Sequence, residues 1–239
     1  MAKVSKIHVL WIMLKTIYIS LKYSVASMRV TARPDIDRIA RQWSKDLLAC
    51  VDVHYTIHNP HQVQLQPNRP YILMSNHASH YDIPLILLSV PGSIRMISKK
   101  EIFRIPIWGY ILRRAEFLTI ERNNPQQAIK DLELVKEKMQ SGIIPWIAPE
   151  GTRSRHGKLN PFKKGAFMLA LQTQALIIPI GIRGSGNILP PDTWDFNIGQ
   201  DVEIHINPPI DTTNYSITTR NELISAVRQS IQEASGMPD

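Results

Sequence analysis

Hydrophobic residues recur along the chain in two spacings that alternate with each other. Short apolar or alternating runs, which are typical of buried and half-buried strands, occupy residues 51–57, 71–75, 94–98, 117–120, 143–147, 176–182 and 202–206. Apolar residues three and four positions apart, the spacing of amphipathic helices, occupy residues 83–90, 125–139, 166–172 and 221–234. Strands that alternate with helices predict an α/β fold.

One proline lies inside a predicted strand. Pro179 falls within residues 176–182, and proline cannot donate a backbone hydrogen bond to a neighbouring strand. We therefore expect this strand to lie at an edge of the sheet or to contain a bulge.

The first helical segment, Ile7–Met28, combines an apolar surface with a narrow cationic stripe. Its cations recur every seven residues and so lie nearly on one line: His8, Lys15, Lys22 and Arg29. The rest of its surface carries Leu10, Trp11, Leu14, Ile17, Tyr18, Leu21 and Val25. The longest uncharged apolar run, Val9–Leu14, is much shorter than the roughly 20 residues of a spanning helix. The pattern predicts a helix lying in a membrane interface; the alternative is a helix that packs on its own domain.

A second amphipathic helix, Ile36–Leu48, follows a break at residues 31–34 that ends in Pro34. The two helices predict a membrane-associating helical hairpin over residues 1–50, followed by an α/β domain over residues 51–239. The connection between them is short, so we expect the hairpin to pack against the domain.

Composition narrows the class of partner. The 239 residues suffice for one large domain or two small ones, and 44% hydrophobic residues is typical of a folded protein. A net charge of +8 and a pI of about 9.6 favour an anionic partner: phosphate, nucleic acid or an acidic lipid surface. The single cysteine, Cys50, excludes an internal disulfide and is interpreted as part of the core.

The stretch from Asn76 to Asp82 lies between a predicted strand and a predicted helix. Ligands bind at this end of the strands in open α/β sheets. His77 can accept a proton near pH 7, and a carboxylate on its other ring nitrogen would fix its tautomer and raise its basicity. Asp82 is the candidate partner, although the chain must curl for the two side chains to meet, because residues five apart do not share a helical face.

Two other interpretations of this stretch remain open. A His–Asp pair in a loop can be a surface or capping arrangement. His77, His80 and Asp82 could also bind a metal, since imidazole and carboxylate are ligands of zinc and iron.

Two further predicted strand ends carry arginines. Arg122 follows the strand at 117–120, and residues 150–153, Glu-Gly-Thr-Arg, follow the strand at 143–147. A guanidinium binds phosphate oxygens with two parallel hydrogen bonds, and Gly151 would let the backbone approach a ligand closely. The alternative for each arginine is a surface salt bridge.

Four blocks in a consistent order give the sequence a specific resemblance. NHASHYD at 76–82 is similar to an NHxxxxD motif, KKEIFRIPIWG at 99–109 to a lysine-rich block ending in P-x-x-G, APEGTRS at 148–154 to a PEGTRS block, and LIIPI at 176–180 to a late proline block. TIERNN and FKKG also resemble family elements, with Glu121 where aspartate is usual. Over roughly residues 70–185 the chain resembles the bacterial-type 1-acyl-glycerol-3-phosphate (lysophosphatidic acid) acyltransferases of the glycerolipid acyltransferase family.

The resemblance implies a fold and a set of roles. The family fold is a mixed, largely parallel sheet flanked by helices, and bacterial members start with a membrane-seated two-helix element. His77 would be the general base and Asp82 its orienting partner. The acceptor phosphate site would comprise Arg122, Glu150, Gly151, Thr152 and Arg153. Lys99 and Lys100 would lie near the donor thioester or the oxyanion.

The implied reaction is direct acyl transfer from acyl-CoA or acyl-carrier protein to the hydroxyl of lysophosphatidate, giving phosphatidic acid. No metal or other cofactor is expected, and no nucleic-acid partner. A covalent acyl-enzyme is not expected because the chain has no G-x-S-x-G elbow, although Ser79 lies near His77. The implied location is the cytoplasmic face of an inner membrane, bound monotopically.

Three alternatives differ in what they would bind or release. The same chemistry could serve another lysophospholipid, glycerol 3-phosphate or an amino-lipid acceptor. The His–Asp pair could act on water, which would make the protein a hydrolase. A basic nucleic-acid-binding module is permitted by the charge, but the chain contains no recognition-helix or aromatic-basic motif.

Overall fold

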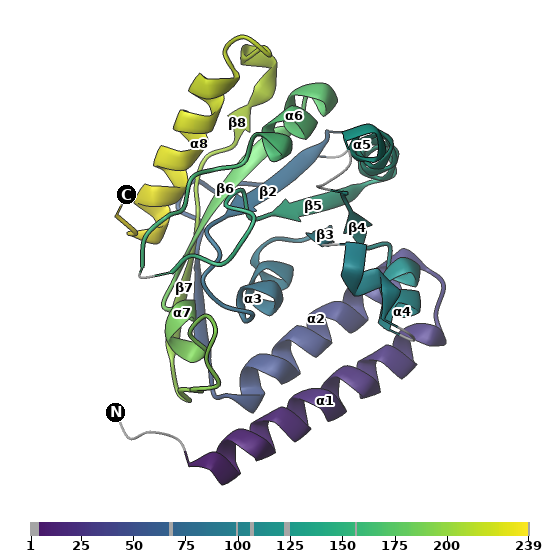
Figure 1. Cartoon of the computed structure of the whole chain (residues 1–239), viewed down its shortest axis with the longest axis vertical. Helices are drawn as coiled ribbons and strands as arrows, with labels where there is room; N and C mark the ends of the chain where they lie inside the picture. Colours follow the sequence, from purple (N-terminus) through teal and green to yellow (C-terminus); the bar gives the residue numbers. More distant parts are fainter. Residues whose placement is uncertain are drawn as a thin grey trace.

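A computed structural model describes residues 5–66, 69–98, 100–105, 108–121, 125–155 and 157–238. Its centre is one twisted sheet in which seven strands follow the order β1-β7-β6-β2-β5-β3-β4, with β8 paired to β6 (Figure 1). The strands are β1 (His54–His58), β2 (Tyr71–Ser75), β3 (Ser93–Ser98), β4 (Leu118–Thr119), β5 (Ile143–Ile147), β6 (Leu176–Arg183), β7 (Asp201–Ile206) and β8 (Ile210–Asp211). The mixed sheet and its helices confirm the predicted fold class.

Helices cover both faces of the sheet (Figure 1). They are α1 (Lys6–Met28), α2 (Arg33–Cys50), α3 (Asp82–Ser89), α4 (Trp108–Arg114), α5 (Pro125–Gln140), α6 (Lys164–Thr173), α7 (Ser185–Ile188) and α8 (Arg220–Ser235), with 3-10 turns at Lys100–Arg104 and Thr212–Asn214. Alternate residues of β2 enter different cores: Leu73 packs with residues of α2 and α3, whereas Ile72 and Met74 pack with residues of α5, α6 and α8. Burial on both faces explains the continuous apolar run of β2.

Strand direction gathers the polar turns at one edge of the sheet. β6, β2, β5, β3 and β4 all run parallel, whereas β7 is antiparallel to β6. The carboxyl ends of β2, β5, β3 and β4 therefore lie on the same side. These are the ends followed by the motifs that the sequence singled out.

The prediction for Pro179 was right in one alternative: β6 lies inside the sheet and not at its edge, but its pairing contains a bulge. Met74 of β2 pairs with Pro179 on one side of the strand. On the other side β8 pairs with residues 176–177 and β7 with residues 180–183, so Pro179 faces the connection between them. Its carbonyl accepts a hydrogen bond from Asn207 N at 3.0 Å. Residue 180 pairs with residue 206 and residue 177 with residue 210, so three residues of the β7–β8 segment lie opposite two of β6, and Pro179 falls at this bulge.

Several predicted boundaries also differ from the structure. The first strand begins at His54, not Val51, because the backbone N–H groups of Val51 and Val53 donate to the Leu48 carbonyl and close the end of α2. The short elements α4, α7, β8 and both 3-10 turns were not predicted, because each is too short to show a hydrophobic period.

The N-terminal hairpin packs against the α/β domain as predicted. Ile12 and Leu48 belong to the same core as α3 and β2. The guanidinium of Arg95 on β3 is 1% exposed and donates to Asp37 Oδ1 of α2 at 2.7 Å and to the Ala115 carbonyl at 2.5 Å. Arg33 of α2 adds a two-pronged pair with Glu116, and its hydrogen bonds lower the pKa of Glu116 to about 2.

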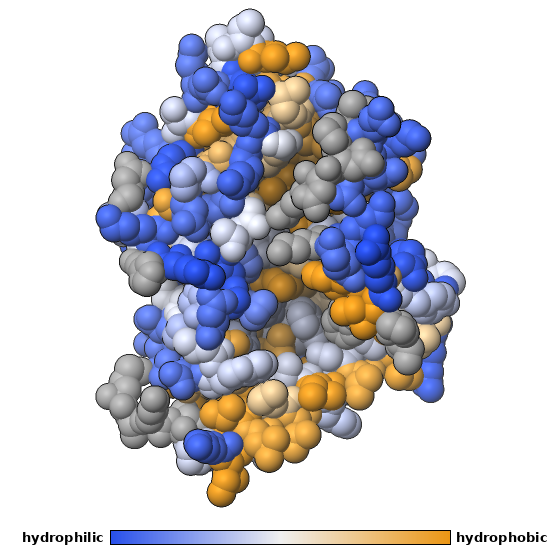
Figure 2. Space-filling model, viewed as in Figure 1, coloured by the Kyte–Doolittle hydropathy of each residue, from blue (hydrophilic) through white to orange (hydrophobic). Residues whose placement is uncertain are grey.

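The outward surface of α1 is apolar and exposed. Its exposed large side chains are Ile7, Leu10, Trp11, Leu14, Ile17, Tyr18, Leu21, Val25 and Met28, whereas Ile12 and Ile19 are buried. Figure 2 shows a hydrophobic band along the side of the molecule formed by α1. By length and composition alone, Lys6–Met28 could also cross a bilayer. One cation of the predicted stripe is engaged inside the hairpin: Lys22 pairs with Asp46 of α2 at 3.2 Å.

Candidate active site

The catalytic candidates His77 and Asp82 meet at the end of β2. His77 Nδ1 lies 2.8 Å from Asp82 Oδ2, and the side chains are 17% and 0% exposed. Asp82 is the first residue of α3, and its Oδ2 also accepts hydrogen bonds from the backbone N–H groups of Ala78 and Ser79 at 2.7 and 2.9 Å. These bonds to the start of the helix impose the curl that brings residues five apart together. The structure thus brings the predicted pair together, and the catalytic role of the pair stays a prediction.

The contact of Nδ1 with Asp82 determines which ring nitrogen of His77 stays available. A carboxylate fixes the proton on the nitrogen that it contacts, so Nε2 of His77 is left as the nitrogen that can accept a proton. The imidazole packs edge-on against the indole of Trp146 on β5, with ring centroids 5.7 Å apart. Trp146 is itself held by a hydrogen bond from its Nε1 to Ser75 Oγ at 2.9 Å. Two strands thus hold the ring of His77.

The amide of Asn76 extends the pairing of β2 with β6 beyond the last paired strand residue. It is fully buried, donates from Nδ2 to the Ile182 carbonyl and accepts from Ile182 N, both at 2.8 Å. A side chain here takes the place of a strand backbone, which leaves the backbone of His77 available to turn away from the sheet. This role of Asn76 could not be predicted from the motif, because its partner Ile182 is distant in sequence.

Glu150, assigned to the acceptor site by the resemblance, lies beneath the turn. Its side chain is 1% exposed. One carboxylate oxygen accepts from His77 N at 3.3 Å and the other from Asn160 N at 2.7 Å, while Ser154 Oγ lies 2.7 and 2.8 Å from the two. The backbone of Ser154 also donates to the His77 carbonyl at 2.5 Å. Glu150 thereby joins the turn after β5 to the backbone of the catalytic candidate.

Arg153 lies on the same turn and is partly exposed. Its Nη2 is 3.2 Å from Asp192 Oδ1, and Arg155 Nη2 is 2.7 Å from Asp192 Oδ2. The salt-bridge alternative for Arg153 is therefore present in the structure. An arginine at the surface of this turn, paired with a carboxylate that is itself more than half exposed, can exchange that partner for a phosphate group.

The remaining predicted site residues divide into two groups. Gly151 has φ of 75°, a conformation that favours glycine, and Thr152 beside it is exposed. Lys100 starts the 3-10 turn that follows β3. Lys99 and Arg122 lie outside the described residues. The residue before Arg122, Glu121, donates its backbone N–H to the buried Asp131 of α5 at 2.8 Å.

An apolar cavity of about 290 Å³ lies next to the turn of residues 76–82 that joins β2 to α3, here called the elbow. Its lining joins the elbow to both helices of the hairpin and to the segment after α7: Met13, Thr16, Ile17, Leu47, His80, Tyr81, Leu189, Trp194 and Phe196. Partial desolvation, together with the positive charge of Arg153, lowers the pKa of His80. Ser79 is fully buried and donates to the Leu189 carbonyl at 3.1 Å, which is a structural position and not that of an exposed nucleophile.

The fold places a histidine–carboxylate pair at the carboxyl ends of its strands, where α/β enzymes bind their ligands. The chain belongs to the Acyltransferase family, whose match covers residues 54–183 and so contains the elbow, the turn after β5 and all of β6. The family suggested by the sequence motifs is thus confirmed.

Individual relatives agree with this assignment. The chain is 37% identical over 141 residues to a chloroplast 1-acyl-sn-glycerol-3-phosphate acyltransferase of Brassica napus, covering 59% of this chain and 41% of the relative. It is 30% identical over 166 residues to the human 1-acyl-sn-glycerol-3-phosphate acyltransferase alpha, covering 69% and 58%. These matches thus span about half the length of the curated relatives.

A solved structure matches over nearly the whole chain. The 1-acyl-sn-glycerophosphate (LPA) acyltransferase PlsC of Thermotoga maritima superposes with a TM-score of 0.78 at 25% identity, and the match covers 95% of both chains. The likeness therefore includes the helical hairpin as well as the α/β domain.

Proposed function

We propose that this protein transfers a fatty acyl group from an acyl thioester to the free hydroxyl of 1-acyl-glycerol 3-phosphate, giving phosphatidic acid. The observation that carries the proposal is the His77–Asp82 pair at 2.8 Å, which opens beside an apolar cavity and near Arg153. The relatives from Brassica napus, human and Thermotoga maritima are acyltransferases of this same acceptor.

The proposed reaction is a direct transfer. Nε2 of His77 takes the proton of the acceptor hydroxyl as its oxygen attacks the thioester carbonyl. The new carbon–oxygen ester bond forms, the carbon–sulfur bond breaks, and the imidazolium returns the proton to the departing thiolate. Asp82 stabilises the imidazolium between these events. The reaction balances without a cofactor, and acyl-CoA or acyl-carrier protein serves as co-substrate.

The acyl chain, the acceptor phosphate and the thioester donor would each contact a different part of the site. The apolar cavity accommodates an acyl chain, because its lining is almost entirely hydrophobic. Arg153, with Arg122 from the turn after β4, would bind the acceptor phosphate, and Gly151 and Thr152 would border it. Lys99 and Lys100, after β3, would face the donor or the oxyanion.

A first test of acceptor binding uses Arg153→Lys. Lysine keeps the charge but loses the planar fork, so KM for the acceptor should rise about tenfold while KM for the thioester stays constant. Initial rates with each substrate varied in turn give both values. Arg155→Lys is the matched control, because Arg155 contacts the same Asp192 but is far more exposed. A rise in thioester KM alone would place Arg153 at the donor's phosphates instead.

We further propose that α1 lies in one leaflet at the cytoplasmic face of the inner membrane, without crossing it. Both lipid substrate and product reside in the bilayer, and the exposed apolar band of α1 borders the cavity through Ile17. The soluble thioester donors approach from the aqueous side. An interfacial helix would hold the cavity opening close to the lipid.

Replacing Leu10, Trp11, Leu14 and Ile17 with serine should release the protein from vesicles that contain anionic lipid. Activity on vesicles should then fall more than activity on detergent-dispersed substrate, because only the first requires the helix to insert. Vesicle flotation followed by the two assays measures both effects. Leu134→Ser with Ile217→Ser is a matched control that removes exposed apolar side chains elsewhere. Undiminished flotation of the quadruple variant would show that α1 is not the membrane contact.

The proposed function itself is tested by incubating the protein with acyl thioester, alone and with a panel of acceptors. The proposal expects ester product with lysophosphatidate and little thiol release without it. Rapid thiol release in water would identify a hydrolase. Faster transfer to another lysophospholipid, to glycerol 3-phosphate or to an amino-lipid would replace the proposed acceptor.

A further inference from the structure

A second cluster of titratable side chains lies at the edge of the sheet formed by β1 and β7. These strands are parallel, with His58 opposite His205 and Thr56 opposite Glu203. Glu203 and His205 are two residues apart on β7 and so project from the same face as His58. That face is the more exposed one of β7, because Val202, Ile204 and Ile206 fill the core on the other side. None of the three residues belongs to the blocks that resemble the acyltransferases.

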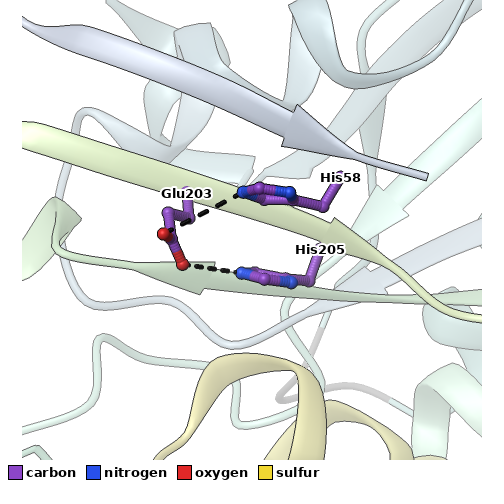
Figure 3. Close-up of side chains that lie close together, drawn as sticks. All are labelled: His58, Glu203 and His205. Carbon is purple, nitrogen blue, oxygen red and sulfur yellow. Dashed lines mark hydrogen bonds and ion pairs between the residues drawn. The ribbon is translucent and has the colours of Figure 1, made fainter. Parts of the chain in front are cut away.

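The three side chains converge on one another (Figure 3). The imidazoles of His58 and His205 are stacked, with centroids 4.5 Å apart and ring planes 18° apart. His205 Nε2 lies 2.8 Å from Glu203 Oε2, and His58 Nε2 lies 3.9 Å from Glu203 Oε1. One nitrogen from each ring and one carboxylate oxygen lie within 4.8 Å of one another. Small side-chain rotations would bring all three onto one ion.

One nitrogen of the cluster, His58 Nε2, makes no hydrogen bond within the described part of the chain. This nitrogen is also buried. Two imidazoles and one carboxylate form a common set of protein ligands for zinc, with a fourth position left to water. We propose that His58, Glu203 and His205 bind a Zn²⁺ ion on the surface of β1 and β7.

The nearest cation does not prevent this arrangement. Arg183 Nη1 lies 3.8 Å from Glu203 Oε2, while its Nε and Nη2 donate to the carbonyls of Ala234 and Glu233 at the end of α8. The guanidinium is thus held in place by the helix and can continue to contact one oxygen of Glu203 while the other binds zinc. Ligating carboxylates commonly keep such an outer partner.

The proposed ion would join the edge of the sheet to its neighbour. β1 is the terminal strand of the sheet order and follows directly after the helical hairpin. A metal that bridges His58 to β7 would bind only the folded chain and would therefore raise the free energy of unfolding. Zinc competes with protons for imidazole nitrogens and carboxylate oxygens, so its affinity for this cluster should fall as the pH is lowered.

Zinc binding to the tag-free full chain in detergent tests the proposal. Isothermal titration with ZnCl₂ should give one ion per chain, with weaker binding at lower pH. Zinc at about one hundred times its dissociation constant should raise Tm by about 5–10 °C. His58→Ala and Glu203→Gln should each weaken binding by about 10–100-fold. MgCl₂ and CaCl₂ should give no comparable signal.

His54→Ala is the matched control, since His54 lies on the same strand but contacts Asp52 outside the cluster. It should bind zinc like the unchanged protein. Undiminished binding by a His58→Ala, His205→Ala double variant would overturn the proposal, because zinc would then bind elsewhere, such as at the elbow. The absence of any zinc signal in the unchanged protein would overturn it as well. Neither outcome depends on acyl transfer, so the test is separate from that of the proposed function.

Discussion

His77→Ala should reduce kcat by about 10²–10⁴-fold, because the variant loses the group that takes the hydroxyl proton. The fold should survive, since His77 is partly exposed on a turn and not part of either core. Initial rates with thioester and lysophosphatidate measure the loss, and thermal unfolding checks the fold. His61→Ala, a change to an exposed histidine of another loop, is the control and should keep full activity.

Asp82→Asn separates the two roles of the carboxylate. An amide cannot stabilise the imidazolium, so kcat should fall even though an amide oxygen can still accept from the backbone of Ala78 or Ser79. Normal turnover by a folded His77→Ala protein would refute the general-base mechanism.

Glu150→Gln should lower both kcat and stability, although Glu150 is too buried to be an open ligand site. Its two oxygens face only donors: His77 N, Ser154 Oγ and the two nitrogens of Asn160. A glutamine must turn its own NH₂ group toward some of them and leave buried donors unpaired, which costs about 1–3 kcal/mol each. The His77 turn would shift as a result. Tm and the two KM values distinguish this role from direct binding.

The matched control is Ser154→Ala, which removes one donor to Glu150 and keeps the carboxylate. Its loss of kcat should be smaller than that of Glu150→Gln. If Glu150→Gln instead raised KM for the acceptor with unchanged kcat and Tm, Glu150 would contact the acceptor, as the resemblance implied.

The sequence predicted the elements whose information is local. The strand at 71–75 could be predicted from its run of five mostly apolar residues. The His77–Asp82 pair could be predicted because the two residues are only five positions apart. The order of the motifs also placed them at neighbouring strand ends. The exposed band of α1 was visible in the spacing of its apolar residues, which repeats over six turns.

Contacts between distant residues could not be predicted in the same way. Glu150 binds the backbone of His77 from 73 positions away, and Asp192 pairs with Arg153 from a segment without any motif. Nothing in a lone glutamate shows that its partners are backbone N–H groups. Pro179 shows the same limit: the sequence allowed an edge or a bulge, and only the pairing of β6 with β7 and β8 distinguishes the two.

The buried pair of Arg95 and Asp37 has a mechanical consequence. It fastens α2 to β3, and Ile12 and Leu48 fasten both hairpin helices to the same core. The hairpin is thus packed firmly against the α/β domain and is not merely connected to it by a flexible linker. With α1 in the membrane interface as proposed, the packing of the protein would set the distance between His77 and the acyl chains, and the proposed lipid acceptor would have to reach that far out of the bilayer.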